Sequence, residues 1–358
     1  MNPKILAGII IALAVLGCVQ HVSEHSAKTV KYAKYFDIEY HKDYKILRVR
    51  YDGKWTDYIL YKNKKPDVAG IPIKIPVKRI ILMSSTHVAQ LEAINATDCI
   101  SGIMWGGRYK WYFKDIEERL KKGKIADVGT PSAPDYEKIL ELKPDLVVIY
   151  VTEYNENVRR KLEELKIPYI IDSEWKETDP LGRAEWVKFF GALTDRDEMA
   201  NEYFSKIEKN IMEIYSSIND TERPKLLWFS IWKGNVYVPR GGSYVAKAVE
   251  YAKADYVFRD LNGSGSAKIT LEDLLLKGND TDVAVYSSYT VKSIEDLLRI
   301  DSRLSEIKAI RDGRIYRISD DYWQLGILHP DVIVKDLAAM CHPDKFQGYK
   351  PRFFIRLT

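Results

Sequence analysis

A long amphipathic segment in the middle of the chain, residues 181–219, constrains the fold more than any other feature. After residue 194, apolar side chains recur at steps of three and four, which predicts a helix with one buried face. Thr194, followed three residues later by Asp197, indicates that this helix begins there and that a shorter helix precedes it. The second helix would be about 35 Å long. We therefore expect a rigid connector between two lobes; an ordinary crossover helix within one larger sheet is the alternative.

Short apolar runs alternate with helical segments on both sides of this connector. Residues 79–83 and 145–150 are such runs before it, and residues 283–286 and 315–318 are such runs after it. Apolar strands that alternate with helices form parallel sheets covered on both faces. The predicted fold class is therefore α/β, with two Rossmann-like lobes of mainly parallel sheet joined by one long rigid α-helix.

One helix-to-strand pattern occurs in each half of the chain. Residues 137–150 and 272–286 both run from a helix led by an acidic residue, through an apolar strand, to a tyrosine. The repeat supports two lobes of similar plan, although chance similarity of two βα units would look the same. Residues 44–61 alternate around Asp52-Gly53-Lys54, which predicts a hairpin at the edge of the first lobe. The predicted divisions are a leader (1–18), a stalk (19–43), a first lobe (44–193), a connecting helix (194–219) and a second lobe (220–358).

The leader differs from everything after it. Residues 1–4 carry a positive charge, residues 5–16 are an unbroken apolar run, and Gly17-Cys18 follows. This is the pattern of a secretory signal, and the run is short for a membrane span. The end of the run resembles a lipobox, in which Cys18 would carry a lipid after cleavage. Leu16 is larger than the residue usual there, so an uncleaved anchor helix is the alternative. In both cases we expect an extracytoplasmic body, anchored to the outer face of the cell membrane.

Charge and cysteine usage argue against several functions. The net charge is only +4, from 55 basic and 51 acidic residues spread along the chain, so we expect no nucleic-acid partner. The three cysteines, Cys18, Cys99 and Cys341, lack metal-ligand spacing. No motif predicts a tightly held metal ion or a resident cofactor. We expect Cys99 and Cys341 to be buried thiols, with a disulfide between them as the alternative.

Five segments carry a resemblance to a known family: residues 79–87, Asp127-Val128-Gly129, and residues 137–150, 180–191 and 329–344. In this order they resemble the cluster III substrate-binding lipoproteins of ABC importers, the iron-siderophore, haem and cobalamin binding proteins. The resemblance runs from about residue 31 to the C-terminus. It implies two lobes hinged on a stiff helix, a small-molecule metal chelate in the cleft between them, and no enzymatic activity.

The same resemblance implies a partner, an ABC transporter permease dimer with its ATPase subunits. In this family a surface glutamate on each lobe docks onto arginines of the permease, and the matching positions are Glu137 and Glu272. Two exposed carboxylates far apart on one face would set the register on a two-fold permease. The alternative is that both are solvated first-turn residues that stabilise their helices.

Ligands of open α/β sheets bind beyond the carboxyl ends of the strands, and here those loops are rich in aromatic, hydroxyl and arginine side chains. Arginine suits carboxylate or phosphate-like groups, although Arg183 could instead pair with Asp179 or Glu185. His87 is the most attractive metal or axial ligand, with a local hydrogen bond as the alternative. The same rule selects the loop at residues 322–324, which follows a later strand, as a candidate for ligand binding. The candidate ligand-binding residues are Ser85, Thr86, His87, Trp105, Arg108, Tyr109, Tyr150, Arg183, Trp232, Arg240, Tyr244, Tyr286 and Trp323.

We therefore expect a membrane-tethered binding protein of an ABC importer that captures a ferric siderophore, haem or corrinoid. Basic residues at the loops leave an oxyanion such as molybdate open as the ligand. A chelatase-like enzyme is the third alternative. It would need a metal-handling histidine with an acidic partner, a pattern that the sequence does not show.

Overall fold

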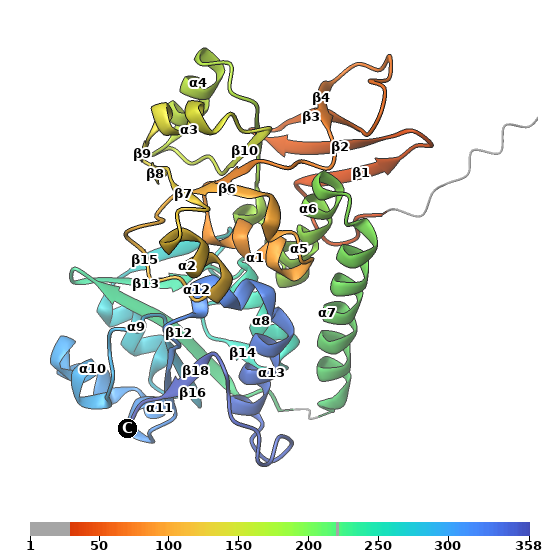
Figure 1. Cartoon of the computed structure of the whole chain (residues 1–358). Helices are drawn as coiled ribbons and strands as arrows, with labels where there is room; N and C mark the ends of the chain where they lie inside the picture. Colours follow the sequence, from red (N-terminus) through yellow and green to blue (C-terminus); the bar gives the residue numbers. More distant parts are fainter. Residues whose placement is uncertain (1–28, 220–221) are drawn as a thin grey trace, which may run out of the picture.

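The computed structural model describes residues 29–219 and 222–358, so Cys18 and residues 19–28 of the predicted stalk lie outside the described residues. Two α/β lobes lie one above the other, and α7 (Asp197–Ser217) runs along one side of both (Figure 1). The predicted α/β class, with two lobes and a long helix between them in sequence, is confirmed.

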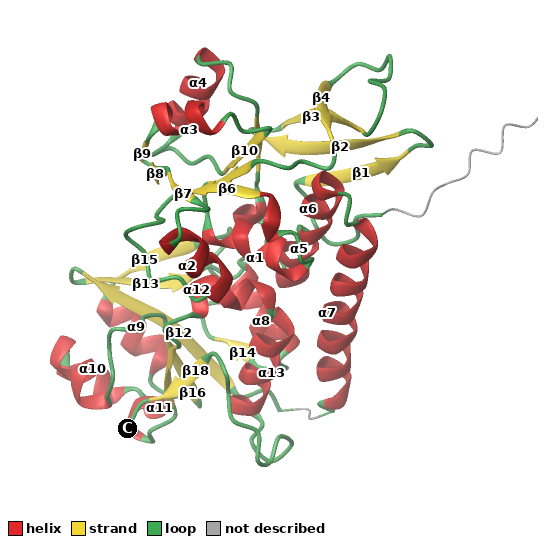
Figure 2. Ribbon diagram, viewed as in Figure 1, coloured by secondary structure: helices red, strands yellow, loops and turns green. Residues whose placement is uncertain are grey.

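The first lobe is built on a five-stranded sheet of order β11-β10-β5-β6-β7, in which every neighbouring pair is parallel. Alternate residues of β10 face two different cores. Leu146 and Val148 join the main core, whereas Val147 and Ile149 join a smaller core that includes residues of α3 and α4. Figure 2 shows α3 and α4 in the same lobe as this sheet. Cover on both faces explains why these strands are continuous apolar runs. The elements are β5 (Ile80–Leu82), α1 (Ser85–Ala93), η1 (Thr97–Cys99), β6 (Ile100–Ile103), α2 (Lys114–Lys121), β7 (Ala126–Asp127), β8 (Gly129–Thr130), β9 (Ala133–Pro134), α3 (Tyr136–Leu142), β10 (Leu146–Ile149), α4 (Glu156–Glu164), β11 (Tyr169–Ile171) and η2 (Glu174–Lys176).

A second, four-stranded sheet extends the first lobe. The predicted hairpin is present as β2 (Tyr44–Tyr51) and β3 (Lys54–Tyr61), which pair antiparallel around the turn at Asp52-Gly53. Two further strands flank it, β1 (Phe36–Tyr40) beside β2 and β4 (Ile71–Lys74) beside β3. The sequence predicts a stalk at β1 and an extended connection at β4, because each strand is short and bordered by polar residues or prolines.

The second lobe has a mixed sheet of order β15-β13-β12-β16-β17-β18. Its centre, β12 with β16 and β17, is parallel, whereas β13, β15 and β18 add antiparallel strands at the edges. The elements are β12 (Lys225–Trp232), β13 (Asn235–Pro239), α8 (Tyr244–Tyr251), β14 (Asp255–Tyr256), β15 (Ser266–Ile269), α9 (Leu271–Gly278), β16 (Val283–Tyr286), α10 (Ile294–Ile300), η3 (Ser302–Glu306), α11 (Lys308–Arg311), β17 (Ile315–Ile318), α12 (Tyr322–Leu325), η4 (Gly326–Leu328), α13 (Pro330–Cys341) and β18 (Phe354–Arg356).

The connector is broken near residue 194, as the sequence predicts, but Thr194 does not cap the helix that follows. α5 (Pro180–Glu185) and α6 (Val187–Thr194) precede a break at Asp195, which adopts a left-handed φ of 59°. Thr194 ends α6 and donates its hydroxyl to the Phe190 carbonyl (2.7 Å) instead of capping α7. α6 and α7 pack closely at Gly191: a Cβ at this position would lie 2.7 Å from the Ala200 Cβ.

Two buried carboxylates fix the start of the described chain, residues 29–35, which we call the N-terminal strap. Glu185 accepts the backbone N–H groups of Lys31 (2.8 Å), Tyr32 (2.6 Å) and Ala33 (3.0 Å). Glu177 accepts those of Lys34 (2.9 Å) and Tyr35 (3.2 Å). The folded body therefore begins inside the range predicted as stalk, since long-range acceptors satisfy a segment that looks polar in sequence.

The thiols and the helices of the described chain complete the description of the fold. Cys99 and Cys341 are free and buried, as predicted, and burial raises the pKa of each thiol to about 12. Within residues 29–219 and 222–358, every helix is too short or too polar to cross a membrane.

Candidate functional site

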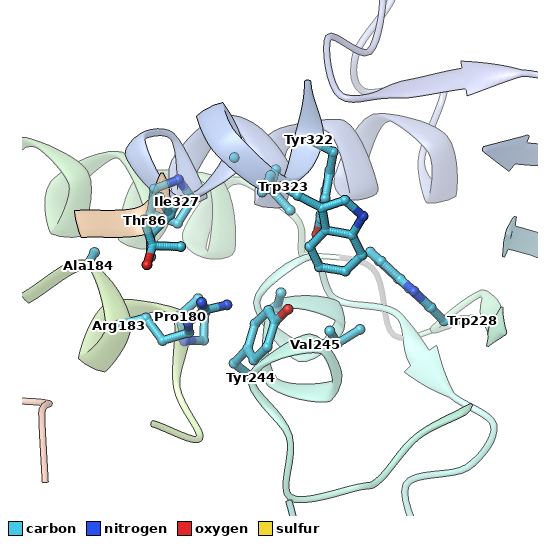
Figure 3. A pocket seen from close by; sticks show the side chains of 14 residues that line it. Thr86, Pro180, Arg183, Ala184, Trp228, Tyr244, Val245, Tyr322, Trp323 and Ile327 are labelled. Carbon is cyan, nitrogen blue, oxygen red and sulfur yellow. The ribbon is translucent and has the colours of Figure 1, made fainter. Parts of the chain in front are cut away.

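A pocket between the two lobes brings together side chains from distant parts of the sequence (Figure 3). Its volume is about 650 Å³, including space open to solvent. Figure 3 shows Thr86 and Arg183 on one side, with Tyr244, Trp323, Tyr322 and Trp228 on the other. We call this site the interlobe pocket. Its lining consists of Thr86, Pro180, Arg183, Ala184, Trp228, Tyr244, Val245, Ala248, Tyr322, Trp323, Gly326, Ile327, Pro330 and Ile333.

Helix ends place the polar members of this lining. Ser84 caps α1 by accepting the N–H of Thr86 (3.2 Å), which holds Thr86 at the first turn. Asp179 caps α5 by accepting the N–H of Leu181 (2.8 Å), so that Arg183 projects one turn further on. Ser243 caps α8 immediately before Tyr244. Three capped helix starts thus converge on the pocket.

Arg183 is the charged residue of the lining, and a buried acid already balances it. Its guanidinium forms an ion pair with Glu174 and lies 4.1 Å from the ring centroid of Tyr244. The partner is neither Asp179 nor Glu185, the two suggested by sequence, because Asp179 caps α5 and Glu185 holds the strap. With its charge balanced, Arg183 offers a flat cation–π surface and spare N–H donors rather than a free positive charge.

Both lobes carry exposed aromatic residues, and the five named here are called the aromatic rim. Trp105 and Tyr109 are partly exposed on the first lobe, as are Trp232, Tyr289 and Trp323 on the second. Burial, and then Tyr289, raises the pKa of Tyr109. An aromatic rim over an apolar pocket can hold a large ligand by stacking on its flat faces.

Comparisons with known proteins agree with this geometry. The family model for periplasmic binding proteins matches residues 82–322, which is most of the chain. The chain belongs to this family. It is 38% identical over 361 residues to an uncharacterized lipoprotein of Methanocaldococcus jannaschii, covering 94% of this chain and 87% of that one. An Fe(3+)-citrate-binding protein of Bacillus subtilis is 20% identical, covering 80% of this chain and 86% of the relative.

Among solved structures, a periplasmic haem-binding protein of Pseudomonas aeruginosa matches with a TM-score of 0.61. It is 16% identical and covers 79% of this chain and 98% of that chain, so the likeness concerns the fold. As a periplasmic binding protein, the chain is an extracytoplasmic solute-binding protein of the ABC-importer type and not an enzyme.

The predicted site residues of this periplasmic binding protein divide into three groups. Four line the interlobe pocket: Thr86, Arg183, Tyr244 and Trp323. Four more are exposed on the surface and lie outside the pocket lining: Trp105, Arg108, Tyr109 and Trp232. The other five also lie outside the pocket lining: Ser85, His87, Tyr150, Arg240 and Tyr286.

His87 lies in the interior of the first lobe, where it packs 5.9 Å from Phe190 between ring centroids. Its Nε2 is 3.6 Å from Asp172 Oδ2, and burial lowers the pKa of His87 to about 3, so the ring is neutral. Burial, and then the charge of Glu174, raises the pKa of Asp172. Tyr286 is also interior, with its hydroxyl donating to the Ile231 carbonyl (3.2 Å). Both residues therefore pack within their lobes instead of facing the pocket.

Sequence reasoning missed several lining residues, notably Trp228 and Ile327. Trp228 lies in the middle of β12, where period and burial indicate core, and only its place beside α12 brings it to the pocket. Ile327 belongs to η4, a short turn with no clear sequence signal. The one available hint was the aromatic pair Tyr322-Trp323 directly after β17.

The two predicted docking glutamates are both exposed, and their helices lie on the side of the molecule opposite α7 (Figure 1). Glu137 is on α3, and Glu272 is on α9, where it forms an ion pair with Arg303 (3.1 Å). An exposed leucine follows each glutamate by one turn, Leu140 on α3 and Leu276 on α9. An acidic group next to an apolar one therefore occurs twice on this side.

Proposed function

We propose that this periplasmic binding protein captures a metal chelate, such as a ferric siderophore, haem or a corrinoid, between its lobes for import. The observation that carries the proposal is the interlobe pocket, an aromatic and apolar cavity with one charge-balanced arginine. A chelate with a large organic surface suits such a lining better than a bare ion does. The names of relatives that bind Fe(3+)-citrate and haem support the same class.

The proposed ligand contacts are the pocket residues Thr86, Arg183, Tyr244 and Trp323, with the aromatic rim above them. Residues 44–193 and 220–358 would act as the two ligand-binding lobes, and residues 194–219 as the stiff connector. A continuous helix of 21 residues packed against both α6 and α13 resists bending, so closure on ligand is expected to be small.

We further propose that the protein is tethered through a lipid on Cys18 and delivers its ligand to a permease dimer with ATPase subunits. The relative named a lipoprotein supports the tether. The exposed pair Glu137 and Glu272, on helices of different lobes, supports docking on a two-fold partner.

The proposed ligand class is tested by titrating the full chain, in mild detergent, and following tryptophan fluorescence. The ligands are ferric citrate, a ferric hydroxamate, haem, cobalamin and molybdate. We expect saturable binding of at least one chelate at micromolar concentration or below. Binding of molybdate alone would favour the oxyanion alternative, and a failure of every chelate would contradict the proposal.

The same titration tests the site with two matched variants. Trp323 at the pocket and Trp175 away from it are almost equally exposed, 45% and 44%. Loss of an aromatic contact is expected to cost about 1 kcal/mol, so Trp323→Ala should weaken chelate binding roughly fivefold or more. Trp175→Ala should bind like the wild type. Equal effects of the two variants would place the ligand elsewhere.

A further inference from the structure

Gln324 joins the two lobes through its side-chain amide. It belongs to α12 of the second lobe, yet its Oε1 accepts the backbone N–H of Tyr112 (3.0 Å) in the first lobe. Its Nε2 donates to the backbone carbonyl of Lys110 (2.7 Å). Gln324 is 3% exposed, and both bonds are partly buried. The amide therefore pairs with residues 110–112 as a neighbouring strand would.

Gln324 holds residues 110–112, which directly follow Tyr109 of the aromatic rim. Residues 104–113 connect β6 to α2 and carry Trp105 and Tyr109. Within the described chain, the Tyr112 N–H and the Lys110 carbonyl hydrogen-bond to no other backbone group. One side chain thus fixes the course of the loop that carries Trp105 and Tyr109.

The lobes also meet through other contacts, since α12 and η4 pack against α1, and two polar contacts lie further from Gln324. Arg183 stacks on Tyr244, and the Tyr251 hydroxyl donates to Asp179 Oδ2 (3.1 Å); both join α5 to α8. Gln324 instead joins α12 to the rim loop. Separation of the lobes at the rim must therefore break the two Gln324 bonds, whichever contacts persist between α5 and α8.

We propose that Gln324 is a positioning residue that holds the rim loop of the first lobe against the second lobe and so slows ligand release. The inference rests on the proposed function for its effect on ligand, but its effect on the lobes requires no ligand. Two partly buried hydrogen bonds of ordinary strength would shift the closed–open equilibrium roughly 10-fold.

The first test measures the distance between lobes without ligand. Spin labels at Glu118→Cys on α2 and Lys292→Cys before α10 report separation in the full chain by pulsed electron resonance. Wild type should give one short distance, and Gln324→Met should add a longer, open population. Gln324→Glu keeps the acceptor for the Tyr112 N–H but repels the Lys110 carbonyl, so it should open the lobes as well. This nearly isosteric variant tests the proposal even if the methionine variant folds poorly.

The control is Gln90→Met. Gln90 is equally buried, at 3% exposed, but its amide contacts Arg183 within the first lobe. It should leave the distance unchanged. Identical distances in wild type and both Gln324 variants would overturn the proposal, as would equal opening by Gln90→Met.

The second test uses ferric citrate or haem, whichever saturates the wild type. Gln324→Met should raise the dissociation rate roughly 10-fold with a much smaller change in the association rate. Opening without faster release would confine Gln324 to the conformational equilibrium and overturn its effect on ligand. If neither probe binds wild type, the proposed ligand class fails, whereas the distance measurement still decides the role of Gln324 between the lobes.

Discussion

Replacing Glu185 with alanine should destabilise the protein by about 3–5 kcal/mol, the usual cost of removing one partner of a buried charge pair. Glu185 is fully buried and accepts three consecutive backbone N–H groups of the N-terminal strap, together with the Lys188 ammonium (2.8 Å). Alanine would leave these donors without an acceptor. It would also release the strap from α5, the helix that carries Arg183.

The measurement is the midpoint of denaturant unfolding for wild type, Glu185→Ala and a control. Glu202→Ala is the control, because Glu202 is exposed on α7. Its midpoint should match wild type. Glu185→Gln retains one acceptor oxygen and should lie between wild type and alanine. Equal midpoints for Glu185→Ala and Glu202→Ala would show that the strap contributes nothing to stability.

Charge reversal at both docking glutamates should abolish uptake while leaving ligand affinity intact. Loss of a charge pair at an interface costs about 2 kcal/mol or more, so each single change to lysine should reduce uptake roughly 30-fold, and the pair more. The two positions need not be equal. Glu272 is already paired with Arg303, whereas Glu137 shows no ion pair among the described residues.

The measurement is uptake of the bound chelate in cells, with affinity measured on purified protein. Glu202→Lys on α7 and Glu295→Lys on α10 are matched controls, since both residues are exposed carboxylates on helices. They should transport normally. A loss of affinity in the Glu137 and Glu272 variants would place those residues in the ligand site and contradict the docking proposal.

The local sequence pattern was enough to predict the main strands, their pairing and the helices between them. The strands 80–82, 146–149 and 283–286 are short apolar runs, and their parallel pairing follows from the helices between them. The hairpin at residues 44–61 has its own turn signal. The break near Thr194 was also visible, although the capping role assigned to Thr194 was wrong, because its hydroxyl bonds back into α6.

Features decided by distant partners could not be predicted. Glu185 and Glu177 hold the strap by hydrogen bonds, and both lie more than a hundred residues away from it in sequence. His87 follows a strand end, as a ligand would, but packing against Phe190 and Asp172 encloses it. Trp228 looks like an ordinary core residue and reaches the pocket only through the placement of α12. In each case tertiary packing overrides a correct local reading.

The central claim, that ligand lies between the two lobes, is tested most directly by hydrogen exchange with and without the bound chelate. The claim predicts that chelate slows exchange in both lobes at once, in the rim loop 104–113 and in residues 322–328. The four-stranded sheet of β1 to β4 should exchange as in the free protein. Protection confined to one lobe, or centred on that sheet, would contradict the claim.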